Sequence, residues 1–186
     1  MALFYSKSKD LELRYLSNFE ECEVSYEGRN YKSVEKGFQG LKYIISGYES
    51  IGKKFEVGNE YDKLSDSEIK RMGGKGGFKK NGCELNIVKW NKIRVGITRV
   101  LIKSRYENDE KFRKILDKYD KVFHFERGGE KSFWGGNWKK EDVKIEANFR
   151  GKNKLGEIMM EMKWKFIDSD FEEDSDYEYE YEEVWV

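Results

Sequence analysis

Residues 33–45 read SVEKGFQGLKYII, and the apolar positions in this stretch recur with the period of an α-helix. Ser33 is a preferred N-cap residue, and Gly47 is suited to the end of the helix. Four apolar side chains fall on one face of that helix: Val34, Phe38, Leu41 and Ile45. The stretch therefore predicts an amphipathic helix whose apolar stripe belongs to the core.

Strands and further helices are predicted around this helix. A short apolar run at Leu3–Tyr5 and a hairpin with Gly28 at its turn precede it. Helices are expected over residues 65–72, 87–105, 108–119 and 153–164, and a strand over residues 121–125. Because strands and helices do not alternate regularly, we expect an α+β fold: a single helix-dominated domain with a few short strands.

Two of these segments carry more specific expectations. The helix over residues 87–105 should be the central one, with Val100 among its buried side chains and Asn108 capping the helix that follows. The stretch Gly73–Gly77 should form a flexible basic loop, which could approach a ligand closely or serve as a plain connector.

Length and charge define the expected domain. The chain of 186 residues is long enough for one domain with a hydrophobic core and too short for two. Ten of its 36 acidic residues, and no Lys or Arg, lie in residues 168–186, which leaves residues 1–167 with a net charge of +10. We expect a domain over residues 1–167 that favours phosphate-bearing ligands, followed by a disordered acidic tail over residues 168–186.

The composition also predicts a compartment. No apolar stretch reaches the roughly 18 to 20 residues that a membrane-spanning helix needs, and the N-terminus lacks the apolar region of a signal peptide. Cys22 and Cys83 lie in unrelated contexts and His124 is the single histidine, so neither a disulfide framework nor a zinc site is expected. We expect a cytoplasmic protein with no membrane partner, metal or other cofactor, of open oligomeric state.

Four motifs occur in a recognisable order along the chain. They are LSNF at residues 16–19, S-x-E at residues 33–35 followed by Gln39 and Lys42, the pair Trp134–Gly135, and GKNKLG at residues 151–156. In this order and at these intervals the sequence resembles the NADAR (YbiA-like) family of ribosyl N-glycosidases. The resemblance implies an α+β domain that hydrolyses N-glycosidic bonds of ribose, acting on ADP-ribosylated guanine or on phosphoribosyl intermediates of riboflavin synthesis.

Glu35 and Lys42 are the candidates for catalysis that the residues themselves support. Seven residues on a helix span two turns, so both side chains fall on one face with Gln39 between them, at the border of the apolar stripe. A carboxylate near ribose C1 could stabilise an oxocarbenium-like transition state or activate water. A partly desolvated Lys42 could form an imine with the sugar, or it could only donate hydrogen bonds to ribose or phosphate. The alternative is a solvated pair without function.

The resemblance assigns further residues to the site. Glu130 is a second catalytic candidate, although the gap between it and Trp134 is longer than in the family, and Glu126 is expected to bind substrate. Trp134 is expected to stack on a base or ribose, a role that Trp138 could fill instead. The remaining expected substrate contacts are Ser17, Asn18, Phe19, Gln39, Trp90, Gly135 and Asn153. For Asn153 helix capping is the competing role, and His124 is expected to be structural.

The expected partner is a phosphorylated, nucleotide-like small molecule, either free or carried on ADP-ribosylated nucleic acid. Two other functions remain open at this point. The same pocket could bind ADP-ribose or a nucleotide without turnover. The basic residues 1–167, with their Trp and Tyr content, could also bind nucleic acid directly, with the acidic tail as an internal competitor.

Overall fold

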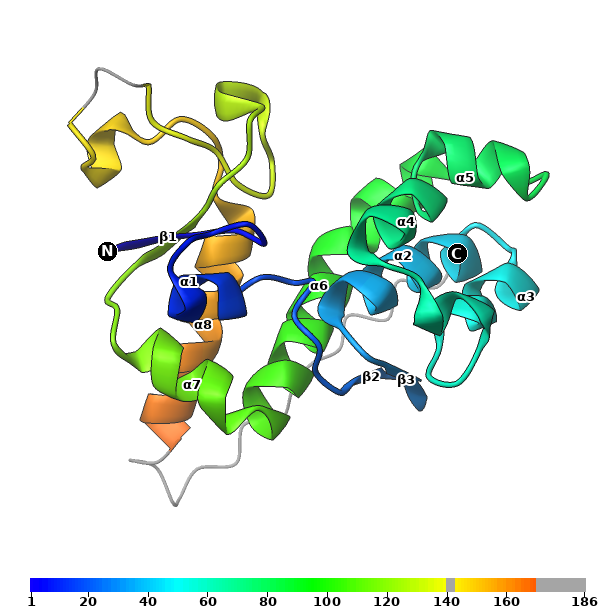
Figure 1. Cartoon of the computed structure of the whole chain (residues 1–186), viewed down its shortest axis with the longest axis horizontal. Coiled ribbons are helices and arrows are strands. Elements are labelled where there is room, and N and C mark those ends of the chain that lie inside the picture. Colours follow the sequence, from blue (N-terminus) through cyan, green and yellow to red (C-terminus); the bar gives the residue numbers. More distant parts are fainter. Residues whose placement is uncertain (140–142, 170–186) are drawn as a thin grey trace.

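A computed structural model describes residues 1–139 and 143–169 of the chain. Strands β1 (Ala2–Phe4) and β4 (Val122–His124) form a parallel two-stranded sheet in which Ala2 faces Val122 and Phe4 faces His124. The fully buried ring of Phe4 stacks on the imidazole of His124, with the ring centroids 5.2 Å apart. Two segments that lie far apart in the sequence are thereby joined (Figure 1).

A second sheet is the predicted hairpin of β2 (Val24–Tyr26) and β3 (Arg29–Tyr31). Its two turn residues, Glu27 and Gly28, have φ angles of 47° and 76°. Positive φ at both positions is what a two-residue hairpin turn matching the twist of its strands requires, and Gly28 adopts it without steric cost. The hairpin packs against the central helix through β2.

Helix α2 (Val34–Ile45) is the helix predicted from residues 33–45. The Ser33 hydroxyl accepts a hydrogen bond from the Lys36 amide at 3.1 Å, which confirms the expected N-cap. Val34 and Leu41 are buried, while Phe38 and Ile45 are half-buried and pack against the same core. The apolar stripe of α2 therefore packs in the core, as its sequence predicted.

Helix α6 (Ile87–Asn108) is the central helix, as predicted, because it packs against α2, β2, α7 (Glu110–Asp117) and α8 (Lys154–Ser169) (Figure 1). The remaining α-helices are α1 (Leu11–Tyr15), α3 (Glu49–Gly52), α4 (Asp66–Met72) and α5 (Lys75–Lys80). Short 3-10 helices are η1 (Lys53–Phe55), η2 (Glu60–Lys63), η3 (Gly129–Lys131) and η4 (Glu146–Asn148). With its two small sheets, the protein has the α+β architecture that the sequence predicted.

The prediction of a flexible loop over Gly73–Gly77 is wrong, because helix α5 begins at Lys75 and includes Gly77. A Cβ atom on Gly77 would lie 1.9 Å from the carbonyl oxygen of Met72, the last residue of α4. Glycine at this position permits the tight junction between two short helices. At Gly77, glycine thus reflects close packing of the backbone and not a flexible loop.

Two details of α6 also differ from expectation. Its last residue is Asn108, and the following Asp109 caps α7 instead, because its Oδ1 accepts a hydrogen bond from the Phe112 amide at 2.9 Å. Val100, predicted to be buried, is 44 % exposed. It lies on the outer face of α6, which the neighbouring elements leave uncovered.

The predicted boundary between a domain over residues 1–167 and a tail over residues 168–186 stays a prediction. Helix α8 includes Ser169, and the rest of the expected tail lies outside the described residues. Within residues 1–139 and 143–169, no helix combines the length and the apolar character needed to cross a membrane.

Candidate active site

A row of three hydrogen-bonded side chains lies along α2. The side-chain amide of Gln39 donates through Nε2 to Glu35 Oε1 at 2.7 Å, and its Oε1 accepts from Lys42 Nζ at 2.7 Å. Glu35 and Lys42 are half-buried, and Gln39 is buried. The amide of Gln39 thus links the carboxylate of Glu35 to the amine of Lys42. The structure brings together the three residues that helical spacing predicted to share a face.

Gly73, at the end of α4, contacts this row and so joins it to a second helix. Its carbonyl oxygen accepts a second hydrogen bond from Lys42 Nζ, at 2.9 Å. A Cβ atom at Gly73 would come within 1.8 Å of Gln39 Oε1, so a larger residue would collide with the amide that joins Glu35 to Lys42. The close approach expected of the glycine-rich stretch is therefore made to Gln39.

Burial moves the pKa values of both ionisable groups toward the neutral form. The pKa of Glu35 is raised by burial, against the opposing effects of the Gln39 hydrogen bond and of the charges of Lys70 and Lys42. Burial also lowers the pKa of Lys42 to about 8, with Glu35 opposing the shift and the charge of Arg94 adding to it. Both shifts favour the uncharged forms, which is the kind of perturbation found in groups that transfer protons in active sites.

Aromatic rings enclose the ammonium end of this row. The Phe38 ring meets the Trp90 and Trp134 rings edge to face, at centroid distances of 4.8 and 5.5 Å. Lys42 Nζ lies 5.4 Å from the centroid of Phe38 and 5.6 Å from that of Trp90. Trp134 belongs to the loop after β4, so this cluster joins that loop to α2 and α6. The structure thereby places Trp90 beside Lys42, and Trp134 against the Phe38 ring.

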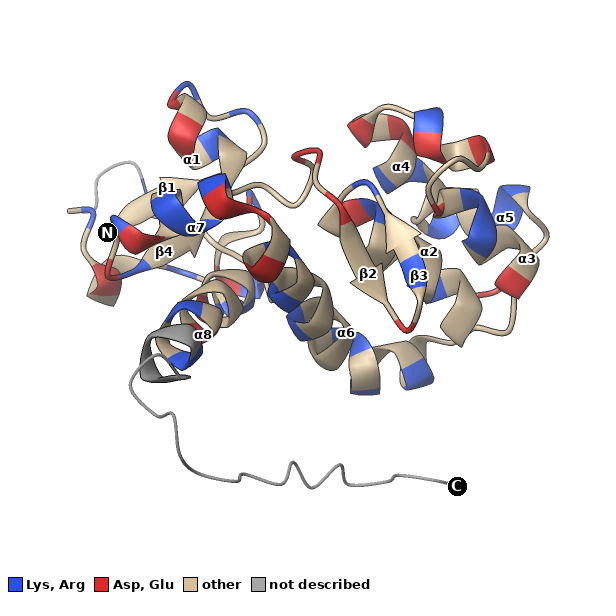
Figure 2. Cartoon of the chain, turned by 90° about the horizontal axis from the view of Figure 1, so that it is seen from below, with Lys and Arg blue, Asp and Glu red and all other residues tan. Residues whose placement is uncertain are grey.

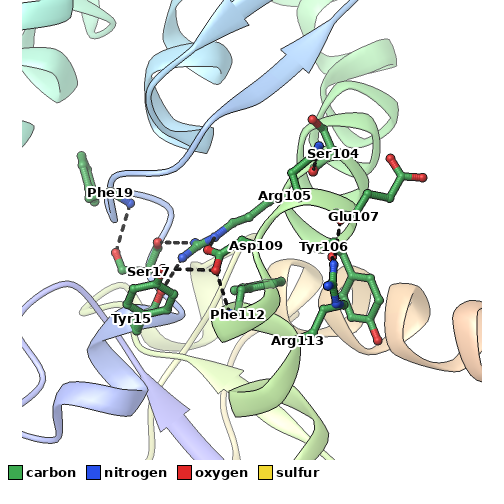
Figure 3. A network of polar contacts seen from close by, with 11 residues as sticks. Tyr15, Ser17, Phe19, Ser104, Arg105, Tyr106, Glu107, Asp109, Phe112 and Arg113 are labelled. Atoms are coloured by element: carbon green, nitrogen blue, oxygen red, sulfur yellow. Dashed lines mark hydrogen bonds and ion pairs between the residues drawn. The ribbon is translucent and has the colours of Figure 1, made fainter.

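The LSNF segment is held next to the first turn of α2. The fully buried side chain of Arg105 donates to the carbonyl oxygen of Ser17 at 2.8 Å (Figure 3), and the amide of Phe19 donates to the hydroxyl of Ser17 at 3.3 Å. The carbonyl oxygen of Asn18 accepts from the amide of Glu35 at 2.9 Å. The segment thus brings Asn18 to Glu35 through its backbone, while Asn18 Oδ1 is buried without a hydrogen-bond partner among the described residues.

Glu126 is engaged within its own loop. Its carboxylate accepts a hydrogen bond from the hydroxyl of Ser132, and this hydroxyl accepts one from the amide of Gly135 at 3.0 Å. A Cβ atom at Gly135 would lie 2.3 Å from the carbonyl oxygen of His124. Gly135 therefore lets the loop lie directly on β4, and Glu126 stabilises the turn that presents Trp134.

Glu130 lies apart from the α2 row. Its exposed carboxylate pairs with Arg150, with 2.8 Å between Glu130 Oε1 and Arg150 Nη1. Among the described residues, no hydrogen bond or ion pair links Glu130 to Glu35 or Lys42. The structure thus brings Glu35 and Lys42 together but does not join Glu130, the third catalytic candidate, to them.

Asn153 uses its side chain on the parallel sheet. Its Oδ1 accepts from the amide of His124 at 2.9 Å, and its Nδ2 donates to the carbonyl of Val122 at 2.9 Å. These bonds continue the edge of β4 as a third strand would, with Asn153 itself at φ 47°. The side chain of Asn153 is therefore bonded to the backbone of β4, while its carbonyl oxygen accepts from the amide of Glu157 in the first turn of α8 at 3.0 Å.

Sequence reasoning missed Arg94, which lies one helical turn after Trp90 on α6. The centre of its guanidinium is 4.2 Å from the centroid of Phe133 and 5.7 Å from that of Trp134. Its charge contributes to the lowered pKa of Lys42. Its position could have been inferred from the i, i+4 spacing to Trp90, because residues four apart lie on the same face of a helix.

His124, expected to be structural, carries one unsatisfied atom. Its ring packs on Phe4, yet Nδ1 is buried without a hydrogen-bond partner among the described residues. Burial lowers the pKa of His124, which favours the neutral imidazole; the charge of Glu126 opposes this and that of Lys70 adds to it. The charge of Lys70 thus acts on the pKa of both His124 and Glu35.

A cavity of about 360 Å³ lies elsewhere, between β4, η4 and the start of α8. Its walls include Phe123, Phe149, Asn153, Met160 and Trp164, and neither Glu35 nor Lys42 lines it. We place the candidate site at the α2 row and not at this cavity, because the perturbed ionisable groups lie at the row. In the described parts of the chain, no cluster of three or more His, Cys, Asp or Glu side chains could hold a metal ion.

Comparisons with known proteins agree with this fold. The NMR structure of the E. coli protein YbiA is similar with a TM-score of 0.61 and 21% sequence identity, over 95% of this chain and 90% of that one. No curated protein matches the sequence significantly. The model of the NADAR domain family matches residues 3–166. This match spans most of the 186 residues, and the chain belongs to the NADAR family.

Proposed function

We propose that this protein is an N-glycosidase that hydrolyses the bond between ribose C1 and a nitrogen of the base in a phosphorylated, nucleotide-like substrate. The two candidate substrate classes are ADP-ribosyl-guanine, from which ADP-ribose is removed, and a phosphoribosylamino-pyrimidine intermediate of riboflavin synthesis. Membership of the NADAR family, which includes glycosidases, supports the reaction class. The observation that carries the proposal is the hydrogen-bonded row of Glu35, Gln39 and Lys42.

Glu35 faces the positive charge that develops at C1. Cleavage of a ribosyl N-glycosidic bond passes through an oxocarbenium-like transition state, which an adjacent carboxylate stabilises electrostatically. Because the pKa of Glu35 is raised, the same group can also take a proton from an attacking water and return it to the leaving nitrogen. Gln39 keeps the carboxylate oriented through its 2.7 Å hydrogen bond.

In the alternative route, the ring oxygen takes a proton from the carboxyl of Glu35, the ribose ring opens to an iminium between C1 and the nitrogen of the base, and Lys42 acts as the nucleophile. The neutral amine adds to C1, one of its protons passes to that nitrogen, and the base leaves as a free amine, which leaves an iminium between C1 and Nζ. Water then adds to C1, releasing the sugar aldehyde and the protonated lysine. A pKa of about 8 supports this role, since about a tenth of the amine is neutral at pH 7. In the milder version, Lys42 only hydrogen-bonds to ribose or phosphate.

The half-buried ring of Trp134 supplies a face or an edge for a planar base or the ribose ring. Trp90 is 3 % exposed and contributes from behind, because its ring packs on Phe38, which Trp134 also meets. The charge distribution supports a phosphorylated ligand, because residues 1–167 carry a net charge of +10 and Lys and Arg recur along α6 (Figure 2). We extend the proposal to substrate carried on nucleic acid as well as free nucleotide.

The test is direct incubation with both substrate classes. The full-length protein is mixed with ADP-ribosylated guanine, as a mononucleotide and within an oligonucleotide, and separately with phosphoribosylamino-pyrimidines. Released base and sugar are measured by liquid chromatography and mass spectrometry. The Glu35→Gln variant serves as the inactive control, and Glu84→Gln, which alters an exposed carboxylate away from the row, serves as the matched active control.

Release of one base by the wild type and by Glu84→Gln, but not by Glu35→Gln, is the expected result and names the substrate. Saturable binding of these ligands without release of any base would identify a binding module instead. Binding of plain DNA or RNA with a steep salt dependence, again without release, would identify a nucleic-acid-binding protein.

A further inference from the structure

Arg94 projects from α6 into the aromatic cluster beside the catalytic row. Its guanidinium lies 4.2 Å from the centroid of Phe133 and 5.7 Å from that of Trp134. Its charge is close enough to Lys42 to lower the pKa of that amine. Two cationic side chains, from α2 and α6, thus lie on the same side of the molecule next to rings suited to a nucleotide.

The guanidinium of Arg94 forms no hydrogen bond or ion pair with any other described residue, and its Nε is buried without a partner. Neighbouring arginines differ in this respect. Arg99, further along α6, pairs with Glu161 at 3.0 Å, and Arg105 donates to the carbonyl of Ser17 at 2.8 Å. A half-buried arginine with unused donors costs stability, because its hydration is lost without a replacing acceptor. Burial accordingly lowers the pKa of Arg94.

We infer that Arg94 binds a phosphate group of the substrate. This inference rests on the proposed function for the identity of the substrate, and it names the residue that recognises the phosphorylated end. An arginine fork matches the oxygens of a phosphate in a bidentate manner, and stacking on Phe133 holds the plane of the fork before the ligand arrives. A bound phosphate would supply the acceptor that the buried Nε lacks and would neutralise the charge next to Lys42.

Direct binding of two small ligands tests this inference without turnover. Ribose 5-phosphate and ribose differ by the phosphate alone, and their affinities for the full-length protein can be compared by isothermal titration calorimetry. We expect the wild type to prefer ribose 5-phosphate, and Arg94→Met to lose about tenfold or more of that preference. The matched control is Arg99→Met on the same helix, which should keep the preference.

A second measurement follows the side chain itself. The Nε–H of Arg94 gives its own ¹H–¹⁵N signal, assigned by its absence in Arg94→Met, and adding ribose 5-phosphate should shift this signal while ribose leaves it in place. The inference is overturned if the wild type binds both ligands equally, if Arg94→Met keeps the preference, or if Arg99→Met loses it to the same extent. Circular dichroism establishes that each variant is folded.

These results are separable from those that test the proposed function. A wild-type protein that binds ribose 5-phosphate through Arg94 but releases no base from either substrate class retains this inference and loses the proposed function. An enzyme that hydrolyses phosphorylated and dephosphorylated substrates equally well retains the function and loses this inference.

Discussion

Lys42 Nζ donates a hydrogen bond of 2.9 Å to the carbonyl oxygen of Gly73, and this contact joins the end of α4 to the last turn of α2. Gly73 is also confined sterically. The side chain of Gln39, which accepts a hydrogen bond from Lys42, leaves no room for a Cβ atom at Gly73. The row of Glu35, Gln39 and Lys42 is thus confined by backbone on one side, and its geometry can be disturbed without changing any of its members.

We expect Gly73→Ala to lower kcat/KM by about tenfold or more, since the new methyl group would displace Gln39 and misplace both groups it orients. The free energy of unfolding should fall by about 1–3 kcal/mol, as is usual for overpacking. Gly76→Ala is the matched control, because a Cβ atom at Gly76 meets no atom within 4 Å. Equal activity of the two variants would contradict the proposed dependence on Gln39.

Glu35→Gln should fold normally and lose most turnover, by about 100-fold or more, because the amide keeps the shape of the carboxylate but not its charge. Its thermal stability at pH 7 should be no lower than that of the wild type. The pKa of Glu35 is raised in the folded protein, so ionisation of this carboxyl opposes folding as pH rises through that pKa, and the uncharged amide of the variant removes this effect. Initial rates and thermal denaturation check the two expectations, and near wild-type turnover by a folded variant would remove Glu35 from the mechanism.

Borohydride distinguishes the two roles proposed for Lys42. If an imine forms, reduction during turnover should attach the sugar to the peptide that contains Lys42, and mass spectrometry should show the added mass. Lys42→Arg should then lose both adduct and activity, because a guanidinium cannot serve as this nucleophile. Lys36→Arg, in which an ammonium paired with Asp62 is replaced, is the control. An active Lys42→Arg enzyme that yields no adduct would leave only the hydrogen-bonding role.

The rate should rise with pH up to about 8 if neutral Lys42 is the nucleophile. The pKa of this amine is lowered to about 8, so the neutral fraction grows tenfold per pH unit below that value and levels off above it. Rates of base release between pH 6 and pH 9.5, at constant ionic strength, measure this rise and the level region above it. A flat profile over this range would contradict the nucleophilic role.

Arg105→Lys should lower the free energy of unfolding by about 2–4 kcal/mol, because one ammonium cannot replace the bonds that the buried guanidinium makes to Tyr15, Ser17 and Asp109. Arg99→Lys, in an exposed pair with Glu161, should cost less than about 1 kcal/mol. Urea denaturation of both variants measures the difference. Similar losses would mean that the segment before α2 is held by other contacts.

The local part of this site could be predicted from sequence. Glu35, Gln39 and Lys42 follow from helical spacing alone, because residues at i, i+4 and i+7 share a face in any α-helix. Arg94 could not be placed in the same way, since its environment depends on how the loop after β4 crosses α6. For the same reason, the exposed ion pair of Glu130 with Arg150 and the occupied amide of Asn153 emerge only from tertiary structure.

The errors in the predicted elements have physical causes too. Asn108 and Asp109 are both good capping residues, and the choice between them depends on where α6 stops. In Gly73–Gly77, low helix propensity was overridden by the close contact between α4 and α5, which at Gly77 leaves no room for a side chain.

The pairing of β1 with β4 also determines when this sheet can form during translation. Ala2 leaves the ribosome 120 residues before its partner Val122, and at about 5–20 residues per second β1 waits roughly 6–24 s for β4. During that interval the apolar strand has an open edge, which is a hazard for aggregation. The loop bearing Trp134 is made later still, so the half of the site that comes from α2 and α6 is synthesised before the half that covers it.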